Sequence, residues 1–308
     1  MSNRFRPHLA LIAVQILFGT WPIIGKIVLR SISVTGLVAC RLVGAAIAFS
    51  LLQRQLKPLL RMPRRDFLLL VICSLSGVVG NQLLYVKALS LTTVINAALL
   101  TATIPVFTLF VSILVGFDDW SLKRLLGIAV ACAGVVYLIN PANAQLTPET
   151  TVGNLLLIAN ALLYAAYIVI SKRLFERYGA LNVITWIFVL SALMVAPLGF
   201  ISFRNENLSA IGWNTWLLVG VIILLPTVGA YYLNAWALTH VSPGTVASYI
   251  YLQPLIAFGF APLVLGERWN SRTGIATLLI FAGVALVTTP GRSRAVREIS
   301  EHPDALAH

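Results

Sequence analysis

Long stretches without a charged side chain run through most of this 308-residue chain. Nineteen uncharged residues separate Arg6 from Lys26, and 60 separate Glu206 from Glu267. A helix that crosses a lipid bilayer needs roughly 20 predominantly apolar residues. The chain is 59% hydrophobic and 10% charged, whereas a soluble domain carries about 25% charged residues. This composition excludes a soluble enzyme, a nucleic-acid-binding domain and a disordered chain, because so much apolar surface requires lipid as its solvent.

Charged residues and turn signals divide the chain into ten apolar segments. The turn at 241–244 splits the longest uncharged run, and Arg41 alone interrupts the second segment. The expected spans are about 9–29, 34–52, 67–87, 92–116, 122–140, 152–171, 181–202, 213–238, 243–265 and 273–290. The strands of a membrane barrel would alternate apolar and polar residues over about ten positions, and these runs are continuous and longer. The sequence therefore predicts an all-α integral membrane protein with ten transmembrane helices.

The positive charges favour one side of these predicted helices. An even number of spans puts both termini on the same side, and that side holds 15 of the 22 Lys and Arg residues, against five on the other. By the positive-inside rule, both termini are cytoplasmic, in a multi-pass protein of the plasma (inner) membrane. The net charge of +12 is thus an orientation signal and a contact for the lipid bilayer, and no nucleic acid is expected as a partner.

The cysteines and histidines give no pattern that would hold a metal or a cofactor. Cys40, Cys73 and Cys132 all fall within apolar spans without metal-ligand spacing, and the four histidines are scattered. We therefore expect no metal, no cofactor and no catalytic residue. The expected partners are a small-molecule substrate and the lipid bilayer, for a monomer or a homodimer.

The chain contains an internal repeat. A shift of 149 residues aligns Pro105 with Pro254 and Asp118 with Glu267, and near the start of each half a shift of 146 fits better. The first repeat covers 1–145, the second covers 146–292, and a polar cytoplasmic tail follows at 293–308. Each repeat holds five predicted spans, and an odd number inverts the second repeat relative to the first, as in many secondary transporters. The duplication therefore predicts alternating access to a site between the halves.

Both halves resemble the five-helix EamA domain of the drug/metabolite transporter superfamily, over about residues 9–290. The residues that carry the resemblance are Ile104-Pro105, Gly116-Phe117-Asp118, Leu126-Gly127 and Ala133-Gly134-Val135 in the first copy, and Gln253-Pro254, Leu265-Gly266-Glu267-Arg268 and Ala282-Gly283-Val284 in the second. An acid, normally Glu, usually closes the fourth helix of each repeat in that family, and here the first copy has Asp118. Arg41 also fits the pattern. The resemblance implies a ten-helix carrier of amino acids or related small metabolites, often an exporter.

Polar residues within the predicted spans are candidates for substrate binding, because a polar group in the bilayer is costly. Gln82 and Tyr85 share one helical face, and the 149-residue shift places Tyr231 and Asn234 at the equivalent positions. The alternative is that such residues only hold helices together through hydrogen bonds. The full set of substrate-binding candidates is Gln82, Tyr85, Asn96, Asn160, Tyr164, Tyr231, Asn234, Trp236 and Tyr249.

A second group of residues is expected to act in structure or gating. Arg41 either binds a substrate carboxylate or bonds to helix-end carbonyls as a clamp, and the clamp is favoured. Pro105 and Pro254 are candidate hinges, although a static kink would look the same in sequence. Asp118 and Glu267 are candidate gating acids, which helix-end structure would explain equally well.

The most consistent function is a secondary transporter for small polar metabolites such as amino acids, with export as the expected direction. All ten acids lie at span ends or in loops, which favours a facilitator or an exchanger over a proton-driven pump. An exchanger of phosphorylated or nucleotide-linked metabolites is the alternative. A membrane-embedded enzyme is less consistent with the sequence, because such enzymes usually gather His, Asp or Glu at the membrane face.

Overall fold

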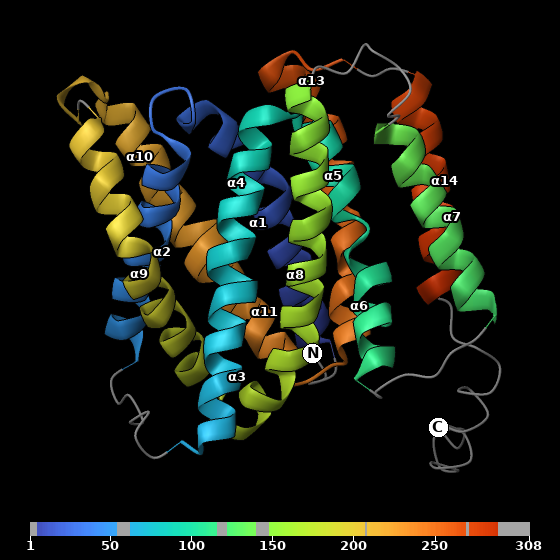
Figure 1. Ribbon diagram of the computed structural model, residues 1–308, viewed down its shortest axis with the longest axis horizontal. Helices are drawn as coiled ribbons and strands as arrows, with labels where there is room; N and C mark the ends of the chain where they lie inside the picture. Colours follow the sequence, from blue (N-terminus) through green and yellow to red (C-terminus); the bar gives the residue numbers. More distant parts are fainter. Residues whose placement is uncertain are drawn as a thin grey trace.

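The structure is a computed structural model that describes residues 5–53, 62–115, 122–139, 148–206, 208–268 and 271–288. All regular secondary structure in these ranges is helical (Figure 1). The helices of the first half are α1 (Arg6–Val28), α2 (Val34–Leu52), α3 (Arg64–Ser74), α4 (Asn81–Leu91), α5 (Val94–Thr101), α6 (Ile104–Leu114) and α7 (Leu122–Ile139). Those of the second half are α8 (Pro148–Tyr178), α9 (Ala180–Asn205), α10 (Trp213–Ile222), α11 (Ala230–Leu238), α12 (Pro243–Ser248), α13 (Leu252–Leu265) and α14 (Ser271–Thr288).

Eight helical stretches in the described residues are long and apolar enough to cross a membrane. They are α1, α2, α3–α4, α5–α6, α8, α9, α10–α11 and α12–α13. The two further helices, α7 and α14, have 18 residues each and pack side by side (Figure 1). The prediction of an all-α membrane protein is confirmed, while the count of ten spans and the inversion of the two halves stay predictions.

Two of the long helices change their winding midway, at positions that the 149-residue shift relates. A π-helical segment at Leu75–Gly80 joins α3 to α4, and another at Ile223–Gly229 joins α10 to α11. Pro226 accounts for the second segment, since a proline lacks the N–H that an α-helix needs. In the first segment, a Cβ on Gly77 would lie 2.1 Å from the ring of Tyr167, so only glycine allows this close approach. Single π-helical turns within α-helices often occur at functional sites.

The contacts between the halves follow the repeat. Helix α1 packs against α11 and α13 of the second half, and its equivalent α8 packs against α4 and α6 of the first half. The equivalent pair α2 and α9 also pack against each other, at one side of the bundle (Figure 1). Each half therefore buries its first helix against the other half, and the centre of the molecule lies between α1, α4, α8 and α11.

Candidate functional site: a cavity between the halves

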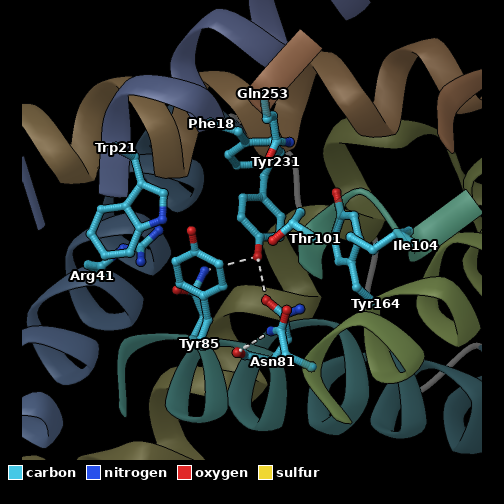
Figure 2. A pocket seen from close by; sticks show the side chains of 12 residues that line it. Phe18, Trp21, Arg41, Asn81, Tyr85, Thr101, Ile104, Tyr164, Tyr231 and Gln253 are labelled. Carbon is cyan, nitrogen blue, oxygen red and sulfur yellow. Dashed lines mark hydrogen bonds between the residues drawn. The ribbon is translucent and has the colours of Figure 1, made fainter. Parts of the chain in front are cut away.

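A polar and aromatic cavity lies at this centre (Figure 2). Its lining comes from both halves: Phe18, Trp21, Arg41, Asn81, Gln82, Tyr85, Thr101, Ile104, Asn160, Tyr164, Tyr231 and Gln253. The cavity volume is about 60 Å³. The cavity is therefore narrow in this conformation, and a whole metabolite would need it to widen.

Hydrogen bonds between the halves hold the cavity lining in place. The amide nitrogen of Gln82 donates to the hydroxyl of Tyr231 at 2.9 Å, and both side chains are buried. Asn160 donates to the backbone carbonyl of Asn81 at 2.8 Å, which fixes α8 at the start of α4. The ring of Tyr231 lies edge-on to the ring of Phe18, with 5.7 Å between centroids. These contacts give the cavity a fixed arrangement of amide and hydroxyl groups around aromatic faces.

Arg41 brings the single formal charge among the twelve lining residues. Its side chain is 1% exposed, and its guanidinium carbon lies 3.9 Å from the ring centroid of Trp21 (Figure 2). Nε donates to the hydroxyl of Thr227 at 3.1 Å, and that hydroxyl donates to the carbonyl of Ile222 at 2.7 Å. Nη1 is buried and has no hydrogen-bond partner among the described residues. The side chain of Arg41 therefore binds a hydroxyl in the second π-helical segment, while its Nη1 group has no hydrogen-bond partner among the described residues.

Five of the nine predicted substrate-binding residues line the cavity: Gln82, Tyr85, Asn160, Tyr164 and Tyr231. Asn234 lies just behind them, since its amide donates to the hydroxyl of Tyr164 at 3.2 Å. It is placed to orient that ring, without being part of the lining.

The structure places the other three predicted binding residues away from the cavity. Asn96 donates to the hydroxyl of Thr92 at 3.3 Å, near one end of the bundle. The ring of Trp236 packs against His240 at 4.4 Å. The hydroxyl of Tyr249 lies 2.8 Å from Nδ1 of His8, in the first turns of α1.

Six lining residues were not among the predicted candidates: Phe18, Trp21, Asn81, Thr101, Ile104 and Gln253. The repeat could have indicated one of them, Phe18, through an equivalent residue that was itself a candidate. Phe18 is equivalent to Tyr164 through the 146-residue shift, and Ile104 is equivalent to Gln253 through the 149-residue shift. The amide nitrogen of Gln253 also donates to the side-chain oxygen of Gln15 at 2.7 Å, which ties α13 to α1.

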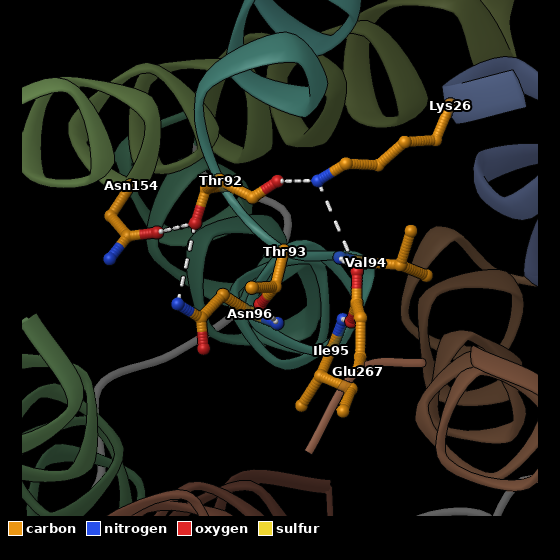
Figure 3. Close-up of polar contacts among 8 residues, drawn as sticks. All are labelled: Lys26, Thr92, Thr93, Val94, Ile95, Asn96, Asn154 and Glu267. Atoms are coloured by element: carbon orange, nitrogen blue, oxygen red, sulfur yellow. Dashed lines mark hydrogen bonds and ion pairs between the residues drawn. The ribbon is translucent and has the colours of Figure 1, made fainter. Parts of the chain in front are cut away.

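A charged contact closes one end of the bundle (Figure 3). The carboxylate of Glu267 accepts from the backbone N–H groups of Val94 and Ile95 at 2.8 and 3.0 Å. It thus caps the positive N-terminal end of α5. The ammonium of Lys26 lies 3.9 Å from the same carboxylate and donates to the backbone carbonyl of Thr92. The loop after α13 and the end of α1 are thereby fastened to the start of α5.

Lys172, the residue of the second half that is equivalent to Lys26, also donates to backbone carbonyls. Lys172 donates to the carbonyls of Leu238 and Val241 at 3.0 and 3.1 Å. The two shifts align Lys172 with Lys26 and Val241 with Thr92. Lys172 also forms an ion pair with Glu176 at 2.8 Å, one helical turn away. Asp118, the partner of Glu267 in the repeat, lies outside the described residues.

Both candidate hinge prolines follow an interruption in a long helix. Helix α5 ends at Thr101 and α6 begins at Ile104, just before Pro105. A short 3₁₀ segment ends at Tyr251 before α13, whose third residue is Pro254. The interruptions flank the cavity, since Thr101, Ile104 and Gln253 line it.

The model of the EamA-like transporter family matches the chain twice, at residues 6–140 and 151–289. The chain belongs to this family of membrane transporters. An uncharacterized transporter from Archaeoglobus fulgidus is 28% identical over 231 residues, which cover 72% of this chain and 76% of the relative. The uncharacterized inner membrane transporter YedA from Escherichia coli is 28% identical over 298 residues, 92% of each chain. A solved crystal structure with 19% sequence identity has a TM-score of 0.66 over 93% of this chain and 98% of its own, a likeness of fold. The chain is thus a multi-pass membrane transporter.

Proposed function

We propose that this EamA-family protein is a secondary transporter that moves small polar metabolites, amino acids or related compounds, by alternating access, with export as the direction. The observation that supports this most is the cavity itself, because both halves contribute amide, hydroxyl and aromatic groups to it. Transporters built from repeats bind their substrates at such a central interface.

The proposal includes ten transmembrane helices arranged as two inverted repeats, with both termini cytoplasmic. The packing between the halves supports this arrangement. Helix α1 packs against α11 and α13, and its equivalent α8 packs against α4 and α6. In this orientation the end of α1 near Lys26 faces outward, and the end of α8 near Lys172 faces the cytoplasm.

Alternating access requires that the two ends open in turn. The contact of Glu267 with α5 and Lys26 joins the two halves at one end. At the other end, Lys172 binds the carbonyls after α11 within the second half. Both sets of contacts are present in this structure, around a cavity of about 60 Å³. Release of the contact at the Glu267 end would open the cavity to the outside in the proposed orientation.

A single cation in the cavity lining makes exchange of phosphorylated compounds the weaker alternative. A phosphate monoester carries up to two negative charges at neutral pH, while Arg41 alone contributes a positive charge to the lining. Amide and hydroxyl groups dominate the remaining polar surface, which suits compounds with few charges.

Transport by purified protein in liposomes tests the proposal, with a panel of labelled amino acids and organic phosphates. We expect flux of at least one amino acid or close relative, and we expect Tyr85→Ala to lower it without lowering the yield of folded protein. Tyr232→Ala is the matched control, because Tyr232 is half-buried and lies outside the cavity lining. Flux of organic phosphates alone would contradict the proposed substrate, and equal flux in wild type and Tyr85→Ala would contradict the role of the cavity.

A further inference from the structure

We propose that Arg41 binds a carboxylate group, and that the cavity takes organic monocarboxylates as its substrate class, with or without an amino group. This inference rests on the proposed function only in naming the bound compound a substrate. The binding site itself stands on the geometry of Arg41 and its neighbours.

The first support is the burial of an incompletely satisfied cation. Buried charges in proteins are paired or hydrogen-bonded, because transfer of an ion out of water is strongly unfavourable. Arg41 is 1% exposed, and none of the ion pairs among the described residues includes it. Thr227 satisfies Nε, while the buried Nη1 has no partner. An anion in the cavity would complete the set of hydrogen bonds that the protein leaves open.

The second support is the fixed orientation of the guanidinium. The indole of Trp21 covers one face, at 3.9 Å from its ring centroid, and Thr227 holds the edge that bears Nε. The π-helical turn at Ile223–Gly229 places Thr227, whose hydroxyl is itself held by Ile222. A guanidinium held in this way presents its remaining N–H groups along one direction, and its planar fork matches the geometry of a carboxylate. Figure 2 shows Arg41 and Trp21 on the same side of the cavity as Tyr85.

The third support is the asymmetry of the charge. The 146-residue shift that relates α2 to α9 places Ile187 at the position equivalent to Arg41, and Ile187 is a fully buried apolar residue. One side of the cavity therefore carries a cation, while the lining as a whole contains no acid. Such a site favours a compound with one negatively charged end. An α-amino group would meet only neutral acceptors, such as the side-chain oxygens of Asn81 and Gln82, so the site does not require one.

A matched set of ligands tests this inference on the full-length protein in detergent. The probes are butyrate, butanamide, butylamine and butyl phosphate, with the carboxylate, amide and amine of the 3-phenylpropyl skeleton. Binding is measured through quenching of intrinsic tryptophan fluorescence, which Trp21 reports directly, and through the shift in thermal unfolding temperature. We expect each carboxylate to bind about tenfold or more tightly than its amide, because a charge-assisted hydrogen bond is lost in the amide.

Variants of Arg41 test whether this residue causes the preference for carboxylates over amides. We expect Arg41→Gln to abolish the preference for carboxylate over amide and Arg41→Lys to retain part of it, because a lysine keeps the charge and loses the fork. Arg204→Gln is the control, since Arg204 is an exposed arginine whose guanidinium lies 5.6 Å from the ring centroid of Phe200, at the end of α9. If Arg41→Gln fails to fold, the comparison of carboxylates with amides and amines on the wild-type protein still tests the inference.

The inference would be overturned by amides or amines that bind as tightly as carboxylates, or by a carboxylate preference that survives in folded Arg41→Gln. Butyl phosphate binding more tightly than butyrate would also overturn it. Flux of labelled amines without flux of carboxylates in liposomes would refute this inference and leave the transporter function intact. Carboxylate binding that depends on Arg41, in a protein without flux of any compound, would support the site and refute the proposed function.

Discussion

Gln82 and Tyr231 are joined by a hydrogen bond of 2.9 Å, and they are 149 residues apart, the offset of the internal repeat. Equivalent positions of the two halves thus touch each other at the centre of the molecule. Such a contact arises where two related halves face each other across a common axis, because only positions near that axis meet their own equivalents. The side chains differ, and the amide of Gln82 in one half donates to the hydroxyl of Tyr231 in the other.

We expect the loss of this bond to destabilise the protein by about 0.5–1.5 kcal/mol, the usual net value of a hydrogen bond. Tyr231→Phe and Gln82→Leu each remove it, and the double variant should lose less than the sum of the two, because both changes delete the same interaction. Thermal unfolding in detergent measures the three variants, with Tyr232→Phe as the control. Strictly additive losses would show that the two side chains do not stabilise each other.

The close contact of Gly77 with Tyr167 gives a second prediction, on stability. We expect Gly77→Ala to lower the free energy of unfolding by about 1–3 kcal/mol, the usual range for overpacking, because the added Cβ would lie 2.1 Å from the Tyr167 ring. Gly220→Ala is the matched control in α10, where nothing lies within 4 Å of the added Cβ. This control should stabilise by roughly 0.5–1 kcal/mol, since alanine is the better helix former. Equal unfolding temperatures for the two variants would contradict the prediction.

Charge and hydropathy predicted the positions of several apolar helices well, because the bilayer excludes charge. The predicted segment 34–52 coincides with α2, and the segment 213–238 covers the stretch from α10 to α11. The same signal does not define where a helix ends in water. Helix α8 runs from Pro148 to Tyr178, beyond the predicted 152–171, because its charged last turns continue the helix past the apolar segment. The π-helical segments were also missed, since hydropathy carries no information on which carbonyl each N–H reaches.

The repeat and the polarity of its residues predicted some of the cavity-lining residues, and there is a physical reason why the others were missed. Gln82 and Tyr231 are polar residues in apolar spans, so they stand out, and they line the cavity. Trp21 lines it too, but an aromatic residue in an apolar helix looks the same whether it faces a cavity, a neighbouring helix or lipid. Tyr249 was expected in the cavity and instead meets His8, because depth along a helix does not determine the direction of a side chain.

The contact at the outward end in the proposed orientation predicts a change in accessibility. We expect Glu267→Gln to open this end more often, because it removes the charge that Lys26 approaches and weakens the cap on α5. A single cysteine at Thr101→Cys, with the three native cysteines replaced by alanine, reports on the cavity. In intact cells, a membrane-impermeant maleimide should label this cysteine several-fold faster in Glu267→Gln than in the parent protein.

Glu176→Gln is the control for this experiment, since Glu176 is in an ion pair with Lys172, at the end that we assign to the cytoplasm. Its labelling rate from outside should stay close to that of the parent protein. An increase for Glu176→Gln and none for Glu267→Gln would contradict the assignment of the two ends.

The two prolines at the helix interruptions give a prediction on transport rate. We expect Pro105→Ala and Pro254→Ala to slow flux in liposomes while leaving the unfolding temperature unchanged or raised, because alanine supplies the missing N–H and favours a continuous helix. Pro197→Ala, in the interior of α9, is the control. Its side chain lies outside the cavity lining, so its effect on flux should be the smaller one. Normal flux in both hinge variants would show that the interruptions are static.

The composition of the cavity lining gives a last prediction, on energy coupling. Transporters driven by protons commonly use a carboxylate or a histidine within the membrane, and the twelve lining residues contain neither. Asp66 and Glu267, two of the described acids, lie at the ends of helices, where they bind Arg177 and the N-terminus of α5. We therefore expect flux in liposomes without an imposed pH gradient, and acceleration by unlabelled substrate on the opposite side if the protein works as an exchanger. Flux that appears only with an imposed pH gradient would refute this expectation and direct attention to the acids at the helix ends.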